Sequence, residues 1–311
     1  MTAPVRHWAT LGENTFVAGT WLLWGVYRVF GRALFRLCLY PVVVWYWAAS
    51  PVARAASLEY LQRVQAFHGV IGHTPGWRDT LRHFLSFAET LLDKLLAISG
   101  RYPFERVRLE GADAVRSTMA SGLGAVIVTA HVGCLELCRA LADRDGGFAL
   151  TILVHTAHAE KFNRVLQRLD PGSRVRLLQV SEVGAATAVL LSDCIERGEL
   201  VAIVGDRVPV RTNRTTTLPF LGVDAQLPVG AYVLAALLQC PLFFMGCVRE
   251  GAGHVMVYEQ LADRVELPRG RRDEAVHKVA QCYARSLEAL VRRAPFEWFN
   301  FFPFWDQGKT R

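Results

Sequence analysis

The spacing of hydrophobic residues changes character near residue 106. Between residues 54 and 96, apolar positions recur at intervals of three and four, which predicts helices separated by a turn at 73–76. Beyond residue 106, short apolar runs alternate with amphipathic stretches. We expect strands at residues 107–109, 125–129, 149–155, 175–179, 200–204, 242–248 and 255–258. We expect helices at residues 112–121, 135–143, 159–169, 182–196, 230–239 and 273–293.

This alternation predicts an α/β fold with a mainly parallel central sheet flanked by helices. Ligands bind such sheets at the carboxyl ends of the strands. From the change in pattern we expect an N-terminal helical, membrane-associating region at residues 1–100, followed by one integrated α/β domain at residues 101–311.

Residues 15–49 carry two apolar runs rich in Trp and Tyr, with arginines between them. Neither run reaches the roughly 20 apolar residues of a membrane-spanning helix. Aromatic and Arg residues at the edges of the runs favour a helix that lies in the membrane interface. The alternatives are a tilted single span and a helix hairpin whose aromatic residues pack against the domain.

Composition narrows the choice of partners. Hydrophobic residues make up 52% of the 311 positions, and the formal net charge is +7, so an anionic bilayer or an acidic carrier protein fits this chain. Nucleic acid is not expected, because the basic residues are scattered and no recognition motif is present. The seven cysteines have irregular spacing, which favours free thiols, and we expect neither a metal nor an organic cofactor.

The segment from residue 125 to residue 136 carries the strongest candidate chemistry. An apolar strand ends before His131, Gly133 forms a turn, and a helix opens near Leu135 with Glu136 in its first turn. His131 is suited to accept a proton near neutral pH, and a carboxylate on its other nitrogen would fix its tautomer. Positions five apart diverge by about 140° on one helix, but they can meet across a turn. No Gly-x-Ser-x-Gly elbow is present, so the nucleophile is expected on the substrate.

These residues resemble a known family. The pattern His131-x4-Glu136 is similar to the first motif of the lysophospholipid acyltransferase superfamily, in its lipid A biosynthesis late acyltransferase branch, where it is His-x4-Asp/Glu. The resemblance extends over roughly residues 10 to 305. It also rests on Gly-Asp-Arg at 205–207, Leu-Pro-Phe-Leu-Gly at 218–222, Pro-Val-Gly at 228–230 and the Trp-rich tail at 295–305. The Tyr-Arg-Pro of classical members is replaced by Val-His-Thr at 154–156, which favours a different acceptor.

The resemblance implies an acyltransferase, with residues 101–311 as its catalytic domain. A fatty acyl chain would move from an acyl thioester, on acyl carrier protein or coenzyme A, to a hydroxyl of a glycolipid, phospholipid or other lipid-like acceptor. His131 would deprotonate that hydroxyl, and Glu136 would orient His131. The expected partners are the bilayer, a transiently bound carrier protein and the lipid acceptor, at the cytoplasmic face of a bacterial inner membrane. The alternatives are a lipid or thioester hydrolase with the same dyad and a non-catalytic lipid-binding membrane protein.

Further candidate substrate contacts are Gly133, Asn163, Asp206, Arg207 and Arg214. Backbone amides around Gly133 could bind the oxyanion, or Gly133 could serve the turn alone. Arg207 suits a phosphate or a carrier group, because its planar guanidinium matches anionic oxygens. Asp206 could orient Arg207 or be a satisfied loop carboxylate. Asn163 and Arg214 could reach the substrate or lie on solvated surface.

Overall fold

The computed structural model describes residues 17–144, 149–154, 175–179, 185–208 and 214–307. Within them a seven-stranded sheet has the order β1-β9-β8-β2-β5-β3-β4. Its strands are β1 (Val107–Glu110), β2 (Ala125–Thr129), β3 (Leu150–Val154), β4 (Val175–Gln179), β5 (Leu200–Val204), β8 (Leu242–Glu250) and β9 (Gly253–Ala262). Neighbouring strands are parallel except β8 and β9. The α/β fold with a mainly parallel sheet is therefore confirmed.

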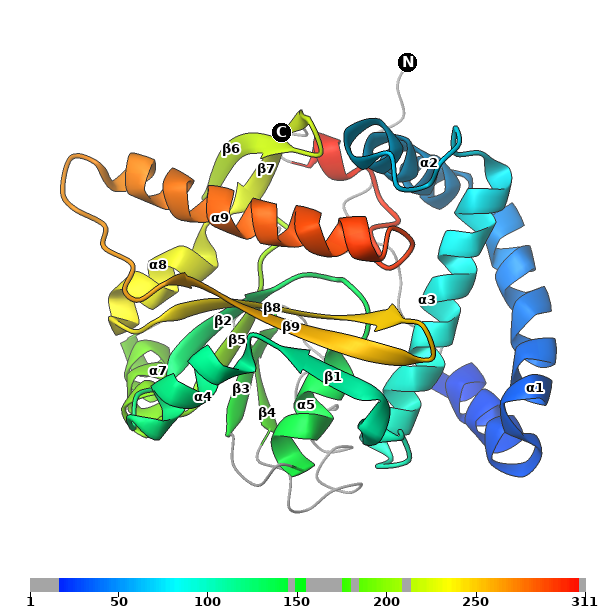
Figure 1. The fold of residues 1–311 in the computed structure, drawn as a ribbon, viewed down its shortest axis with the longest axis horizontal. Coiled ribbons are helices and arrows are strands. Elements are labelled where there is room, and N and C mark those ends of the chain that lie inside the picture. The colour runs from blue at the N-terminus through cyan, green and yellow to red at the C-terminus, as the bar shows by residue number, and fades with distance from the viewer. Residues whose placement is uncertain (1–16, 145–148, 155–174, 180–184, 209–213, 308–311) are drawn as a thin grey trace.

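Both faces of the sheet are covered by helices (Figure 1). All five residues of β2 are buried, with Val126 and Val128 in one core cluster and Ala125 and Ile127 in the other. Such burial on both faces explains why these strands are continuous apolar runs in the sequence. The first cluster includes residues of α2 (Pro51–His68), α7 (Ala185–Glu196), α8 (Gly230–Leu238) and α9 (Arg272–Arg293). The second includes residues of α1 (Val17–Ala49), α3 (Trp77–Ile98), α4 (Ala112–Ala120) and α5 (Leu135–Arg144).

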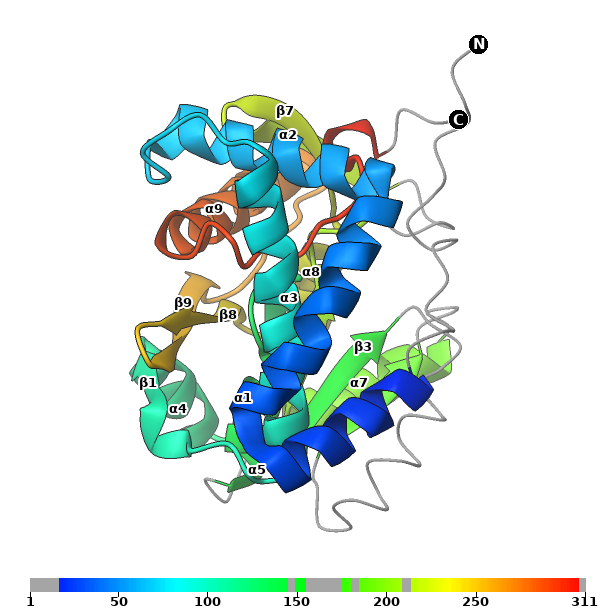
Figure 2. The ribbon, with the colours of Figure 1, turned by 90° about the vertical axis from the view of Figure 1, so that its right-hand side faces the viewer.

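The N-terminal region is helical, as expected. Helix α1 bends at Gly31, whose φ of 75° interrupts the helical backbone, and then runs beside α3 (Figure 2). Phe35, Leu39 and Val43 bury one side of α1 in the same core cluster as residues of α3. In the described part of the chain, we find no helix with the length and apolarity that crossing a membrane requires.

A second, two-stranded sheet was not expected from the sequence. Strands β6 (Thr215–Phe220) and β7 (Val223–Pro228) form an antiparallel hairpin in a segment for which the sequence predicted neither strand nor helix. Leu221 and Gly222 connect them, with φ angles of 51° and 78°. Positive φ at both turn positions is typical of tight hairpins, but Leu at the first position is an unusual signal. The hairpin follows β5 in the chain and brings residues 214–228 toward the carboxyl end of the sheet.

Candidate active site

Two neighbouring strands bring His131 and Asp206 together. Strands β2 and β5 pair in parallel, with Thr129 opposite Val204, and the amide of Gly205 donates to the carbonyl of Thr129 at 2.8 Å. The chain leaves both strands at the same edge of the sheet. His131 Nδ1 consequently lies 2.8 Å from Oδ1 of Asp206. The sequence placed both residues at this edge, but it did not pair them.

The carboxylate at His131 is therefore Asp206, which corrects the expected pairing with Glu136. Glu136 lies in the first turn of α5, and its Oε1 is 3.2 Å from Nζ of Lys94 on α3. The helix starts close to the turn, so its first carboxylate faces α3 instead of the imidazole. Burial is the largest single influence and acts to lower the pKa of Lys94, but the charge of Glu136, that of Cys134 and the hydrogen bond with Glu136 together raise it. Lys94 is thus a cation near His131 that sequence analysis did not identify.

Asp206 is held by four hydrogen bonds. Its side chain is fully buried, and its Oδ2 accepts from Nε1 of Trp298 at 2.9 Å, from the amide of His131 at 3.0 Å and from Nδ2 of Asn300 at 3.4 Å. Burial acts to raise the pKa of Asp206, but the charge of His131 and the hydrogen bonds with it hold that pKa well below its usual range, with the charge of Arg207 acting in the same direction. Asp206 is therefore ionised at neutral pH.

His131 combines a fixed nitrogen with an available one. Because Asp206 is an ionised acceptor, Nδ1 of His131 carries the proton, and Nε2 retains its lone pair. Nε2 has no partner among the described residues, and the side chain remains 33% exposed. Burial lowers the pKa of His131, the charges of Arg207 and Lys94 lower it further, and Asp206 opposes them. The imidazole is therefore neutral and able to accept a proton near pH 7.

Gly133 has a backbone role. Its amide donates to the carbonyl of Glu297 at 2.8 Å, and the amide of Cys134 donates to the carbonyl of Cys247 at 2.8 Å. Neither amide is available to an oxyanion, so the expectation for Gly133 as an oxyanion donor is not supported by this geometry. Its φ is 58°, and a Cβ would lie 1.8 Å from the carbonyl oxygen of Cys247. Glycine is required here because the chain passes so close to β8.

The Trp-rich tail forms one wall of the site. The amide of Phe299 donates to the carbonyl of His131 at 2.8 Å, and Val132 forms a β-bridge with Trp298. Trp298 is fully buried, and Nε2 of His83 lies 3.0 Å from its carbonyl oxygen. Burial lowers the pKa of His83 to about 3, so this imidazole is neutral and its Nε2 donates. Helix α3 thereby supports the residue that holds Asp206.

Arg207 is held by the same tail. Its Nη2 donates to the carbonyl of Phe299 at 3.2 Å, its Nε lies 3.4 Å from Oδ1 of Asn300, and its guanidinium lies 5.5 Å from the centre of the Phe302 ring. The side chain is partly exposed, so it borders the site next to His131 and Asp206. Asp206 was expected to orient Arg207 or to be a satisfied loop carboxylate. In the structure its carboxylate orients His131, a role that the sequence analysis did not consider.

Two other candidates from the sequence are Asn163 and Arg214. Asn163 is outside the described residues. Arg214 is exposed at the start of β6 and lines a separate cavity. Within the described part of the chain, no group of three or more His, Cys, Asp or Glu side chains is arranged to hold a metal ion.

Sequence analysis did not identify three residues that contact or influence the site: Trp298, Asn300 and Lys94. The tail was noted for its aromatic content, but nothing in the sequence shows which of its polar atoms face Asp206. Lys94 occupies one position in a long amphipathic helix and carries no local signal.

A comparison with protein-family models gives a match. The family model of bacterial lipid A biosynthesis acyltransferases matches residues 95–307, a range that contains His131, Asp206 and the tail. A search of curated proteins gives no significant match.

Proposed function

The chain belongs to the bacterial lipid A biosynthesis acyltransferase family, and we propose that it transfers a fatty acyl chain from a thioester to a hydroxyl of a lipid acceptor. The observation that carries this proposal is the contact of His131 with Asp206, made at the carboxyl ends of two adjacent strands. It leaves Nε2 of a neutral, partly exposed imidazole available as a base.

The reaction uses His131 as a general base. Its Nε2 removes the proton of the acceptor hydroxyl as the oxygen attacks the thioester carbonyl. Asp206 stabilises the imidazolium that forms, because its buried carboxylate lies 2.8 Å from Nδ1. The tetrahedral intermediate then releases the thiolate, which takes the proton from Nε2. General-base catalysis of this kind contributes about 10²–10⁴-fold in rate.

Cations next to the base assist this chemistry. The positive charges of Lys94 and Arg207 lower the pKa of His131, which keeps it unprotonated before the acceptor binds. The charge of Arg207 also favours the developing oxyanion. In this proposal Glu136 is a positioning residue, because it contacts Lys94 and not the reacting atoms.

The donor that we propose is an acyl thioester of acyl carrier protein or coenzyme A, and the acceptor is a glycolipid, phospholipid or similar lipid. The formal net charge of +7 suits an acidic carrier. No metal or organic cofactor enters the proposed mechanism.

We also propose that the enzyme acts at the cytoplasmic face of a bacterial inner membrane, with α1 against the bilayer. Large apolar side chains remain exposed along α1 and at the starts of α2 and α3. They are Leu37, Val42, Val44, Trp45, Tyr46, Val52 and Trp77. Tyr and Trp are favoured at membrane interfaces, and an exposed apolar surface of this kind marks an interaction site.

Radiolabelled acyl-carrier donor, incubated with the detergent-purified enzyme and host lipids, tests the function. We expect label to enter one lipid species with wild type and Glu136→Gln, and not with His131→Ala, provided that all three have the same circular dichroism spectrum. Label found only in free fatty acid would instead indicate a hydrolase. No transfer from carrier-protein or coenzyme A thioesters, together with lipid binding that survives His131→Ala, would indicate a non-catalytic lipid-binding protein.

A further inference from the structure

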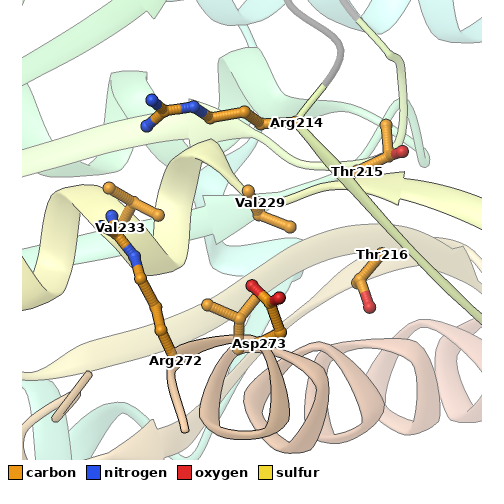
Figure 3. Close-up of a pocket in the computed structure, with 8 residues that line it drawn as sticks. Arg214, Thr215, Thr216, Val229, Val233, Arg272 and Asp273 are labelled. Carbon is orange, nitrogen blue, oxygen red and sulfur yellow. The ribbon is translucent and has the colours of Figure 1, made fainter. Parts of the chain in front are cut away.

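A cavity lies outside the residues of the candidate active site. It has a volume of about 320 Å³ and is enclosed by the start of β6, the first turns of α8 and α9, and the residue that precedes α8 (Figure 3). Its lining comprises Arg214, Thr215, Thr216, Val229, Val233, Arg272, Asp273 and Val276. Neither His131 nor Asp206 lines it, so it is a site of its own, called here the Arg214–Arg272 cavity.

Two guanidinium groups dominate its charge. Arg214 extends over the start of α8, and Arg272 extends to the same side from α9 (Figure 3). Both side chains are exposed, and neither forms an ion pair with another described residue. Two cations at one cavity that form no ion pair with a described residue favour an anionic ligand, and the planar guanidinium suits phosphoryl oxygens in particular.

A hydroxyl adds an uncharged donor. Thr216 Oγ1 lies 3.2 Å from Nδ1 of His277, whose Nε2 lies 2.9 Å from the amide nitrogen of Gln281. With Gln281 as the donor, Nε2 of His277 accepts and its Nδ1–H donates to Thr216. The hydroxyl hydrogen of Thr216 is then available to a ligand oxygen.

The other residues that line the cavity indicate which chemical group carries the phosphate. Val229, Val233 and Val276 supply apolar contacts, and the carboxylate of Asp273 points into the space between the two helices (Figure 3). A carboxylate repels a bare dianion but accepts hydrogen bonds from hydroxyl or amide groups. The matching ligand is therefore a phosphate ester joined to a hydroxyl- or amide-bearing unit.

Hydrogen bonds connect this cavity to the backbone of Asp206. The hydroxyl of Thr215 donates to Oε1 of Gln226 at 3.4 Å. The amide nitrogen of Gln307 donates to the backbone carbonyl of Gln226 at 3.2 Å and to that of Asp206 at 3.3 Å. The cavity is thus fixed to the residue that orients His131, as a subsite for one end of a substrate would be.

We propose that the Arg214–Arg272 cavity binds the phosphate ester of one of the two substrates, with the phosphoryl group at Arg214, Arg272 and Thr216 and the adjoining hydroxyl or amide at Asp273. As a substrate subsite, this assignment rests on the proposed acyl transfer. Both a phosphorylated lipid headgroup and the phosphopantetheine arm of the thioester carry this chemistry.

Calorimetric binding of a sugar 1-phosphate, 4′-phosphopantetheine and inorganic phosphate to the full-length protein tests the site without turnover. We expect one of the two esters to bind better than inorganic phosphate and to bind at least tenfold more weakly to the Arg214→Ala/Arg272→Ala double variant. Asp273→Asn should reduce the preference for the ester over inorganic phosphate. Arg269→Ala, an exposed arginine outside the lining, is the matched control and should bind as wild type does.

Kinetics then identify the source of the ester. The double variant should raise the KM of the thioester or the KM of the lipid acceptor at least tenfold, with kcat retained. The proposal is overturned if no probe binds wild type, if the double variant binds both esters as wild type does, or if neither KM changes. His131→Ala should bind the ester normally while transfer is lost. Ester binding without any transfer by wild type would reject acyl transfer and, with it, the subsite assignment, but not the phosphate-ester site.

Discussion

Two carboxylates lie near His131, and their surroundings differ. Asp206, after β5, is fully buried and bonded to His131 through both a ring nitrogen and a backbone amide. Glu136, in the first turn of α5, remains 24% exposed, pairs with Lys94, and leaves its Oε2 without a partner among the described residues. Spacing along the chain favours Glu136 as the partner of His131, whereas pairing of strands in the sheet delivers Asp206. A carboxylate 75 positions away in sequence is the closer one in space.

Asp206→Asn should have the largest effect on catalysis. An amide at this position can donate to Nδ1 of His131 and so favour the wrong tautomer, and it cannot stabilise the imidazolium. We expect kcat to fall by about 10²–10⁴-fold, the range of general-base catalysis as a whole. Steady-state acyl transfer with saturating donor measures it.

The same variant distinguishes catalysis from folding. The amide oxygen keeps the acceptor position toward Trp298 and the amide of His131, but it lacks the negative charge that strengthens these hydrogen bonds, which costs about 1–3 kcal/mol in the free energy of unfolding. Kinetics are therefore measured well below the unfolding midpoint. A folded Asp206→Asn protein with kcat within tenfold of wild type would contradict the assigned role.

Trp298→Phe should have the next largest effect. It removes the Nε1 donor to Oδ2 of Asp206 while retaining an aromatic ring in a buried position. A hydrogen bond to a charged group is worth about 1.5–3 kcal/mol, so we expect a loss of that size in the free energy of unfolding by urea. We also expect kcat to fall by about tenfold, because Asp206 is held less firmly; that factor corresponds to about 1.4 kcal/mol.

Trp305→Phe is the matched control, because it makes the same change from indole to phenyl at another tryptophan of the tail. Its Nε1 is buried without a hydrogen-bond partner in the described part of the chain, so the substitution removes no such bond. We expect it to leave kcat near the wild-type value. Equal losses of kcat in the two variants would show that packing of the tail, and not the bond to Asp206, supports the site.

The strands of the central sheet and the β6–β7 hairpin differ in how well the sequence predicted them. Strands β2, β4 and β5 occupy the predicted residues. For β2 and β5, which lie inside the sheet, the reason is that strands buried on both faces are short apolar runs bounded by polar residues. The hairpin of β6 and β7 was missed, because buried and exposed residues are mixed along both strands and Leu221 does not signal a tight turn. Local pattern sufficed where burial was complete on both sides of an element.

The candidate site was predictable in location but not in pairing. His131 and Asp206 were both placed at strand ends, because strands that alternate with helices imply parallel pairing and a shared edge. Which strands are neighbours, β2 with β5, depends on the global strand order, which one sequence does not contain. The contribution of Trp298, 92 positions from Asp206, depends on the same long-range topology.

Glu136→Gln should have a smaller effect than either of these substitutions. It removes the charge that pairs with Lys94, and a partly exposed ion pair is worth about 0–1 kcal/mol. We therefore expect kcat to fall by less than about tenfold, with no change in the order of donor preference. If Glu136→Gln loses as much activity as Asp206→Asn, the pairing with His131 that motif spacing predicts is right for the working enzyme.

Lys94→Met should change the pH dependence and little else. Rate depends on neutral His131, so it falls as pH drops through the pKa of that group, which lies below its ordinary value chiefly because of burial. The positive charge of Lys94 lowers this pKa further by disfavouring the imidazolium. Removing the charge should raise the pKa, so the acidic limb of kcat/KM moves to higher pH while the plateau at alkaline pH is nearly retained. Lys94→Arg keeps the charge and should keep the wild-type profile. A limb that moves to lower pH in Lys94→Met, or moves equally in both variants, would show that Lys94 acts on the site through packing, and its charge would then have no part in tuning the base.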